Sequence, residues 1–249
     1  MPIIKCSGSI PESFTTRRGL LTSFGALALV GCQGATTSVR FKVIASAIID
    51  GRPVESSSVM EITYSKVTHS LIGNGGATRL YGEALIFDLD GKGTIYILPT
   101  QHDPNNSLTQ VYEDGILATL EIRNSIGSLS DADFASLRSA NGRYPFKLKT
   151  SRLPVIVSFK NENDPKTIFE IQPGEIGRYF SGVQFTGLDI AITTGRLTYK
   201  LRKRLPWLDT TIAPRKIFAR DPPGALRPYR ELPFSYVITP ADFFGDASR

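Results

Sequence analysis

An alternation of apolar and polar residues between positions 39 and 98 restricts the fold of this chain more than any other feature. Val39, Phe41 and Val43 alternate with charged residues, a period of two that is typical of a strand with one buried face. Asp50-Gly51 interrupts the pattern, and this dipeptide favours a tight hairpin turn. The alternation resumes over residues 58–67, so the sequence predicts two antiparallel strands joined at Asp50-Gly51.

A second hairpin is predicted directly after the first. Residues 80–89 and 94–98 are rich in β-branched and aromatic side chains, and Asp90-Gly91-Lys92-Gly93 separates them. The two hairpins together predict a four-stranded antiparallel meander over residues 39–98.

The middle of the chain carries helical patterns between further strands. Residues 108–120 show apolar side chains near helical spacing, and residues 173–180 are predicted to form a short helix. Ser130 is a predicted N-cap, with Asp131 and Asp133 in the first turn of a helix. Buried strands are expected at 154–159 and 183–193. The predicted fold class is therefore α+β, a mainly antiparallel sheet built from hairpins with two or three short helices, spanning residues 39–208.

The C-terminal part, residues 209–249, has a different texture. Residues 209–233 mix prolines with basic residues, which disfavours regular structure and predicts an extended arm. Residues 234–238 alternate again and predict a final strand that docks on a sheet edge.

The N-terminal 31 residues have the layout of an export signal. Arg17 and Arg18 precede about a dozen mildly apolar residues, which end in small residues before Cys32. The apolar run is shorter than the roughly 18–20 residues that a spanning helix needs. Residues 1–31 are therefore predicted to be a signal peptide. An amphipathic helix with a core cysteine is the alternative, but its glycines disfavour a helix in water.

Two short motifs make the export prediction more specific. Residues 16–21 resemble a twin-arginine signal, and Leu29-Val30-Gly31-Cys32 resembles the lipobox of bacterial lipoproteins. In lipoproteins of that type the cysteine sulfur carries a diacylglycerol, and acyl chains of this kind hold a protein on a membrane. The resemblance implies a lipidated Cys32, a short tether over residues 32–38, and a body facing the periplasm. Gln33 implies the outer rather than the inner membrane.

Three segments of the mature chain resemble an uncharacterised family of bacterial proteins. These segments are residues 153–159, 163–167 and 204–208. The resemblance implies a single domain and brings no activity with it.

A glycine-rich stretch over residues 69–79 is the first candidate site. Gly73, Gly75 and Gly76 would let backbone N–H groups converge on an anion, with Arg79 assisting. The stretch lacks the ending of a P-loop, and the alternative is an ordinary loop between two hairpins.

A basic segment over residues 200–208, which contains four cations, is the second candidate site. Arg202, Lys203 and Arg204 lie close to Trp207, the only tryptophan of the chain. Such a patch would bind anionic lipid headgroups or an acidic protein partner. The alternative is a solvated strand end with the tryptophan buried, because a lone tryptophan is usually packed in a core.

Catalytic and metal sites have little support in the sequence. The two histidines, His69 and His102, have no ligand-spaced neighbours, so no metal or other cofactor is predicted. There is no nucleophile elbow of the Gly-x-Ser-x-Gly type. The formal net charge of +6 is not concentrated in a dense stripe, which argues against nucleic-acid binding.

These patterns together predict a membrane-anchored envelope lipoprotein that acts as a binding or structural module without an evident catalytic site. The alternative is a periplasmic enzyme exported by the twin-arginine route, such as a hydrolase that uses His69 or His102.

Overall fold

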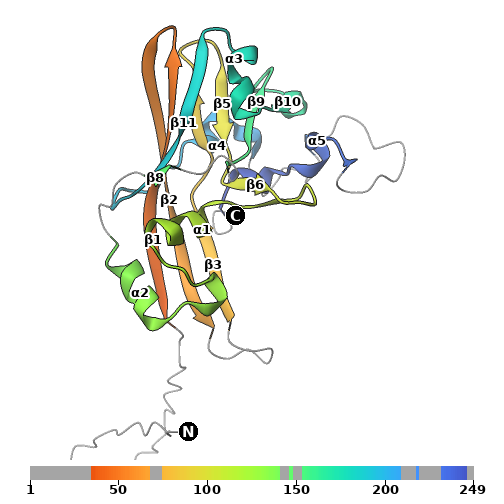
Figure 1. Cartoon of the computed structure of the whole chain (residues 1–249). Coiled ribbons are helices and arrows are strands. Elements are labelled where there is room, and N and C mark those ends of the chain that lie inside the picture. The colour runs from red at the N-terminus through yellow and green to blue at the C-terminus, as the bar shows by residue number, and fades with distance from the viewer. Residues whose placement is uncertain are drawn as a thin grey trace, which may run out of the picture. The chain divides into compact units, whose positions relative to one another are not determined.

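The predicted hairpin at Asp50-Gly51 organises the whole fold. β1 (Thr36–Ile49) and β2 (Arg52–Val67) pair along their full length. Asp50 and Gly51 both adopt positive φ angles, 48° and 80°, which is the geometry of a tight hairpin turn. Every second residue of β1 is buried from Thr37 to Ile49, as the alternation predicted. Figure 1 shows β1 beside β2.

The computed structural model describes most of the chain from residue 35 on. The tether predicted over residues 32–38 is therefore too long, because residues 36–38 belong to β1. The described residues are 35–67, 75–140, 146–147 (backbone only), 153–208, 217–218 and 231–245. They belong to one compact unit that runs from Gln33 to Arg249. No described helix is long and apolar enough to span a membrane. The predicted signal peptide, Cys32 and most of the predicted arm lie outside the described residues.

The first sheet has five antiparallel strands in the order β3-β2-β1-β11-β8. Its other strands are β3 (Gly75–Tyr81), β11 (Val183–Ile192) and β8 (Phe146–Lys147). β11 lies where the sequence predicted a strand and pairs with β1, so the centre of this sheet joins segments far apart in the chain.

The second sheet has four antiparallel strands in the order β10-β9-β5-β4. It consists of β4 (Leu85–Asp88), β5 (Thr94–Ile97), β9 (Ile156–Phe159) and β10 (Ile168–Glu170). A separate two-stranded ribbon joins β6 (Thr100–His102) to β7 (Leu108–Gln110). The hairpin of β4 and β5 confirms the predicted second hairpin.

The prediction of one four-stranded meander over residues 39–98 is wrong. Residues 80–89 are not one strand: β3 ends at Tyr81 in the first sheet, and β4 starts at Leu85 in the second. Gly82 makes the break possible, because its φ of +128° disfavours other residues and a side chain at this position would overlap the Met60 side chain.

Short helices connect the strands, and there are more of them than the two or three predicted. The α-helices are α1 (Tyr112–Thr119), α2 (Asp131–Arg138), α3 (Ile176–Tyr179), α4 (Leu201–Arg204) and α5 (Phe234–Val237). Single 3-10 turns are η1 (Ile126–Ser128), η3 (Pro165–Thr167), η4 (Pro173–Glu175), η5 (Pro206–Leu208) and η7 (Pro240–Phe243). Mostly antiparallel sheets with short helices make this an α+β fold.

The helix predicted after Ser130 is confirmed together with its cap. The Ser130 hydroxyl accepts the backbone N–H of Asp133 at 3.2 Å, and the Asp133 carboxylate accepts the Ser130 N–H at 2.8 Å. This reciprocal capping box fixes the start of α2. The helix predicted over residues 108–120 starts later, at Tyr112, because residues 108–110 pair with β6.

Two hydrophobic cores lie on opposite faces of the second sheet. Phe87, Ile95 and Ile97 face the first core, which fills the space toward the first sheet and includes buried residues of α1 and α2. Tyr96 and Val157 face the second core, which α4, η5 and η7 close from the other side. The second sheet is thus covered on both faces.

The C-terminal strand predicted for residues 234–238 is wrong, because this segment forms α5. The Ile238 N–H donates to the Phe234 carbonyl at 3.0 Å, which is a helical turn. Five alternating residues are too few to distinguish a strand from one helical turn. Ile238, Phe243 and Phe244 are buried in the second core, so this end of the chain belongs to the folded body.

Candidate functional site: a cationic groove

A groove of about 630 Å³ opens between the edges of the two sheets. Its walls come from three elements: the first half of β2, the strand β4 and the segment at α4. The lining residues are Glu55, Ser56, Ile86, Phe87, Asp88, Lys200, Lys203 and Arg204. Three cations and two carboxylates therefore face one cavity.

One wall of the groove is an edge of β2 that β3 leaves uncovered. β3 pairs only with residues 61–67 of β2 and ends at Tyr81. The next position on this edge, Val59, is bonded by Thr198: the Val59 N–H donates to the Thr198 hydroxyl at 3.0 Å, and the Thr198 N–H donates to the Val59 carbonyl at 3.1 Å. Beyond Val59 the edge continues past Ser57 and Glu55 along the groove.

The opposite wall is the outer edge of β4. The Ser56 hydroxyl donates to the Ile86 carbonyl at 2.7 Å and ties this edge to β2. The Ser58 hydroxyl makes a second, longer bond to the Glu83 carbonyl at 3.4 Å. These side chains close the base of the groove and hold its walls together.

A buried carboxylate positions the cationic side of the groove. Glu83 is 2% exposed, and its carboxylate accepts the backbone N–H groups of Lys200 and Leu201. Burial raises the pKa of the Glu83 carboxyl, although these two hydrogen bonds and the charges of Arg202 and Lys200 oppose the rise. Glu83 thereby fixes the start of α4.

Arg204 is held by an ion-pair network. Its Nε lies 2.8 Å from Glu162 Oε2, and its Nη2 lies 3.1 Å from Glu162 Oε1 and 3.2 Å from Asp88 Oδ1. Burial acts to raise the pKa of Glu162, but the bonds from Arg204 and from the Tyr96 hydroxyl hold this pKa below its usual value. The same contacts raise the pKa of Arg204. Arg204 therefore joins α4 to the second sheet.

Lys200 and Lys203 supply the free positive charge of the groove. Both side chains are exposed, and neither forms an ion pair with a described residue. Asp88 is already opposed by Arg204, and Glu55 accepts a bond from the Ser46 hydroxyl at 3.2 Å. The lining side chains thus carry three positive and two negative charges, and Lys200 and Lys203 are the cations that no described carboxylate pairs with.

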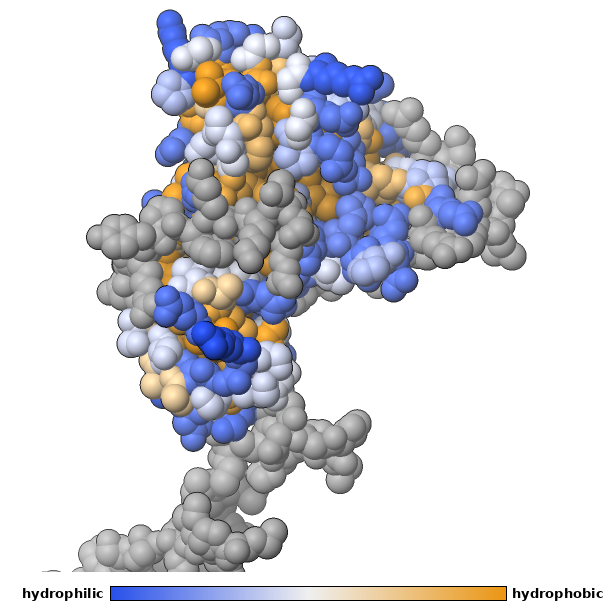
Figure 2. Space-filling model, in the orientation of Figure 1, coloured by the Kyte–Doolittle hydropathy of each residue, from blue (hydrophilic) through white to orange (hydrophobic). Residues whose placement is uncertain are grey.

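Figure 2 shows apolar residues between polar ones on the visible face of the first sheet.

The four predicted residues of the basic segment do not form one surface. Lys203 and Arg204 line the groove, but Arg202 lies over the Phe244 ring, 5.2 Å from its centroid, beside a different cavity. Trp207 donates its indole N–H to the Glu162 carbonyl at 2.7 Å and packs edge-on against Phe159 and Phe218.

Lys200, the first residue of the basic segment, lines the groove with Lys203 and Arg204. The segment forms a helical turn instead of the strand end expected as the alternative, so positions 200, 203 and 204 lie on one side of it. Helical spacing of three cations was the signal that would have grouped them.

The predicted anion loop is divided by the structure. Gly73 and His69 lie outside the described residues, whereas Gly75, Gly76 and Arg79 belong to β3. Their backbone groups serve the ladder with β2, and a side chain at Gly76 would overlap the Ile126 carbonyl. The structure gives these glycines a packing role, and Arg79 is exposed on the sheet.

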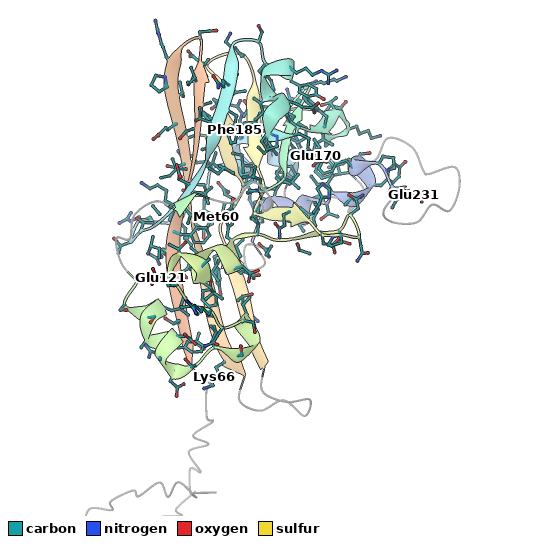
Figure 3. The ribbon with its side chains drawn as sticks, viewed as in Figure 1. Met60, Lys66, Glu121, Glu170, Phe185 and Glu231 are labelled. Carbon is teal, nitrogen blue, oxygen red and sulfur yellow. The ribbon has the colours of Figure 1, made fainter. Side chains whose placement is uncertain are left out.

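His102 pairs with a carboxylate from another strand. Its Nε2 lies 3.0 Å from Glu170 Oε1, and this bond raises the pKa of the histidine although burial acts against it. Figure 3 shows Glu170 on β10. The buried Nδ1 atom has no hydrogen bond of normal geometry, and the same holds for Thr100 Oγ1 and Gln110 Oε1 on the same ribbon. Within the described part of the chain, no group of three or more His, Cys, Asp and Glu residues could hold a metal ion.

Comparison with known proteins adds no relative to this picture. No family model, no curated protein and no solved structure matches the chain. The resemblances to lipoproteins and to an uncharacterised bacterial family stay predictions from the sequence.

Proposed function

We propose that this protein is a lipid-anchored lipoprotein of the bacterial envelope that binds an acidic partner in the cationic groove. The observation that carries the binding role is the pair of exposed lysines, Lys200 and Lys203, which form no ion pair with a described residue and lie beside an edge of β2 that β3 does not cover. Opposite charges attract over about 8 Å at physiological ionic strength, so such a groove favours anionic ligands. The anchor itself rests on the sequence around Cys32.

The length of the tether supports a definite separation between anchor and groove. The described fold begins at Ala35, whose carbonyl accepts the Lys66 N–H at 2.8 Å. The three residues from Cys32 to Ala35 span about 10 Å at most. An acylated Cys32 would therefore keep the Thr36 end of β1 near the lipid headgroups.

The groove lies toward the other end of β1. Ser56 is opposite Ala45, and at roughly 3.3 Å per residue Ala45 is about 30 Å along the strand from Thr36. In Figure 3, Lys66 and Phe185 mark these two ends of the first sheet. A partner in the periplasm fits this spacing better than the headgroups beside the anchor.

One observation favours a second candidate function, a hydrolase. His102 paired with Glu170 resembles a base held by an orienting carboxylate. If the pair is catalytic, His102→Ala abolishes hydrolysis of a small ester substrate such as p-nitrophenyl acetate, whereas Trp207→Phe leaves it unchanged. Equal background rates in wild type and His102→Ala would remove this candidate.

Two measurements test the anchor and the groove separately. Fatty-acid labelling of the wild type, lost in Cys32→Ser together with sedimentation of the protein with membranes, is expected for the anchor. For the groove, a Lys200→Glu/Lys203→Glu variant is compared with an Arg123→Glu/Arg138→Glu control, which changes the net charge equally at exposed sites on other elements. We expect crosslinked envelope partners to be lost only from the groove variant. Partners that are lost equally from both variants, or from neither, contradict the groove.

A further inference from the structure

We infer that the acidic partner is an extended polypeptide segment, which adds as a strand to the uncovered edge of β2. This inference rests on the proposed binding role of the groove. It goes further because it names the class of partner and the backbone groups that hold it.

The hydrogen-bond pattern of β2 shows which backbone groups face the groove. In a strand, successive residues direct their N–H and C=O groups to opposite sides. The Lys66 N–H points toward the side of β1, whereas Val59 points away from β1, toward Thr198. Ser57 and Glu55 lie two and four residues before Val59 in the strand. Their N–H and C=O groups therefore point in the same direction as those of Val59, away from β1. No backbone hydrogen bond from another described residue reaches them on that side.

The chain itself already pairs with this edge. Thr198 meets both the N–H and the C=O of Val59 and occupies the first position past β3. Pro53 has no N–H and ends the edge at the other side. Between Thr198 and Pro53 the edge of β2 therefore offers the N–H and C=O groups of Ser57 and Glu55 and the C=O group of Pro53.

The groove matches a short acidic strand in size and charge. At about 3.4 Å per residue, the edge from Pro53 to Val59 is about 20 Å long, which suits a segment of five or six residues. Side chains of a strand alternate between its faces, so acidic residues at every second position lie on one side. Lys200 and Lys203 line the same cavity as Glu55 and Ser56 and can meet that side.

A peptide fits these groups better than a phosphate-bearing headgroup does. Phosphate oxygens accept hydrogen bonds but cannot donate to the carbonyls of Glu55 and Ser57. A peptide backbone supplies both donors and acceptors, which is the basis of strand addition to an exposed edge.

The test uses the protein purified from cells in a nonionic detergent, with an acetylated hexapeptide in which Glu and Val alternate as the probe. Three matched probes accompany it: the same peptide with Lys in place of Glu, the acidic peptide with alternate amides N-methylated, and vesicles that contain anionic phospholipid. Binding is measured by calorimetry, and the Glu55 and Ser57 amides are followed by hydrogen exchange.

We expect the acidic peptide to bind and to slow exchange at Glu55 and Ser57. Affinity should fall at least tenfold with the Lys probe, with the N-methylated probe, and in Lys200→Glu/Lys203→Glu. Ser57→Pro removes one N–H of the edge and leaves the hydrogen bonds with β1 in place. It should weaken binding of the acidic peptide by a similar factor. The thermal midpoint of this variant confirms that it is folded.

Other outcomes separate this inference from the proposed function. If the N-methylated probe binds as well as the parent while the charge variant binds neither, strand addition is wrong and the cationic groove for acidic ligands stands. If the vesicles bind through the two lysines and the peptide does not, the partner is lipid. If no probe distinguishes the wild type from the charge variant, both proposals fail.

Discussion

The two hydrophobic cores of this protein are built in different ways. The first core is lined mainly by aliphatic side chains from long, regularly alternating strands such as β1. The second core contains a cluster of aromatic rings: Phe243 lies 5.8 Å from Phe218 and 6.3 Å from Phe159 between ring centroids. One side of it comes from the second sheet, and the other side comes from short helices and turns near the C-terminus. A core can therefore form between long periodic strands or between a sheet and short segments that show no period.

The largest effect is expected from two variants, each of which removes one buried ring from one of the cores. Phe41 and Phe243 are both fully buried, and changing either to Ala should cost about 3–5 kcal/mol of unfolding free energy. Because the second sheet is shared by both cores, calorimetry should show one transition in each variant. Tyr199→Ala, at a side chain that is 65% exposed, serves as the control and should change stability by less than about 0.5 kcal/mol. Two separate transitions in Phe243→Ala would show that the cores unfold independently.

A smaller loss of stability is expected when the ion pairs that hold α4 on the second sheet are removed. Arg204→Ala removes the ion pairs with Glu162 and Asp88 and should destabilise by about 1.5 kcal/mol, because the guanidinium is 41% exposed and partly screened by water. Urea unfolding measures the change. Lys203→Ala in the same helix should fall within about 0.5 kcal/mol of wild type. Equal losses in the two variants would mean that the network does not fasten α4.

The corresponding fastening in the first core is the cap of α2. Ser130→Ala removes the hydroxyl that accepts the Asp133 N–H, so a loss of about 1 kcal/mol is expected. Ser130→Asp should retain most of the stability, because its carboxylate can accept the same bond. Urea unfolding of both variants checks the difference, and an Asp variant as unstable as the Ala variant would contradict the role of the cap.

The smallest expected effect is a pH dependence at the ribbon of β6 and β7. Glu170 raises the folded pKa of His102 above its ordinary value of 6.5, so the stabilisation is complete below that pH and is lost as the pH rises through the folded pKa. Urea unfolding at several pH values should show this fall in the wild type and a flatter profile in Glu170→Gln. Identical profiles would show that the pair does not affect stability.

The strands that sequence reasoning located are those with one regularly buried face or a strong turn. β1 and the turn at Asp50-Gly51 were predicted correctly, as were β9, β11 and the cap at Ser130. β2 was predicted only from residue 58 and starts at Arg52. The prediction of a single meander over residues 39–98 is wrong at Gly82, where the chain changes sheets. Which sheet a strand joins depends on distant contacts, such as those of Glu83 with Lys200 and Leu201, more than a hundred residues away. Period alone contains no information about such contacts.

The site was predictable only in part for a similar reason. The basic segment indicated positive charge, and three of its residues, Lys200, Lys203 and Arg204, do line the groove. The other wall comes from β2 and β4, whose edges are exposed by the place where β3 stops. That place is set by tertiary packing around Met60 and Gly82, which no local pattern records.

The bare edge of β2 also has a consequence for crowding on a membrane surface. Copies held in two dimensions meet often, and unpaired strand edges invite edge-to-edge aggregation. Here the exposed stretch is short, bounded by Pro53 and Thr198, and flanked by lysines that repel the same lysines of a neighbouring copy. Neutralising those lysines should therefore promote self-association and also weaken the binding of acidic ligands. Solubility and recognition thus depend on the same two side chains.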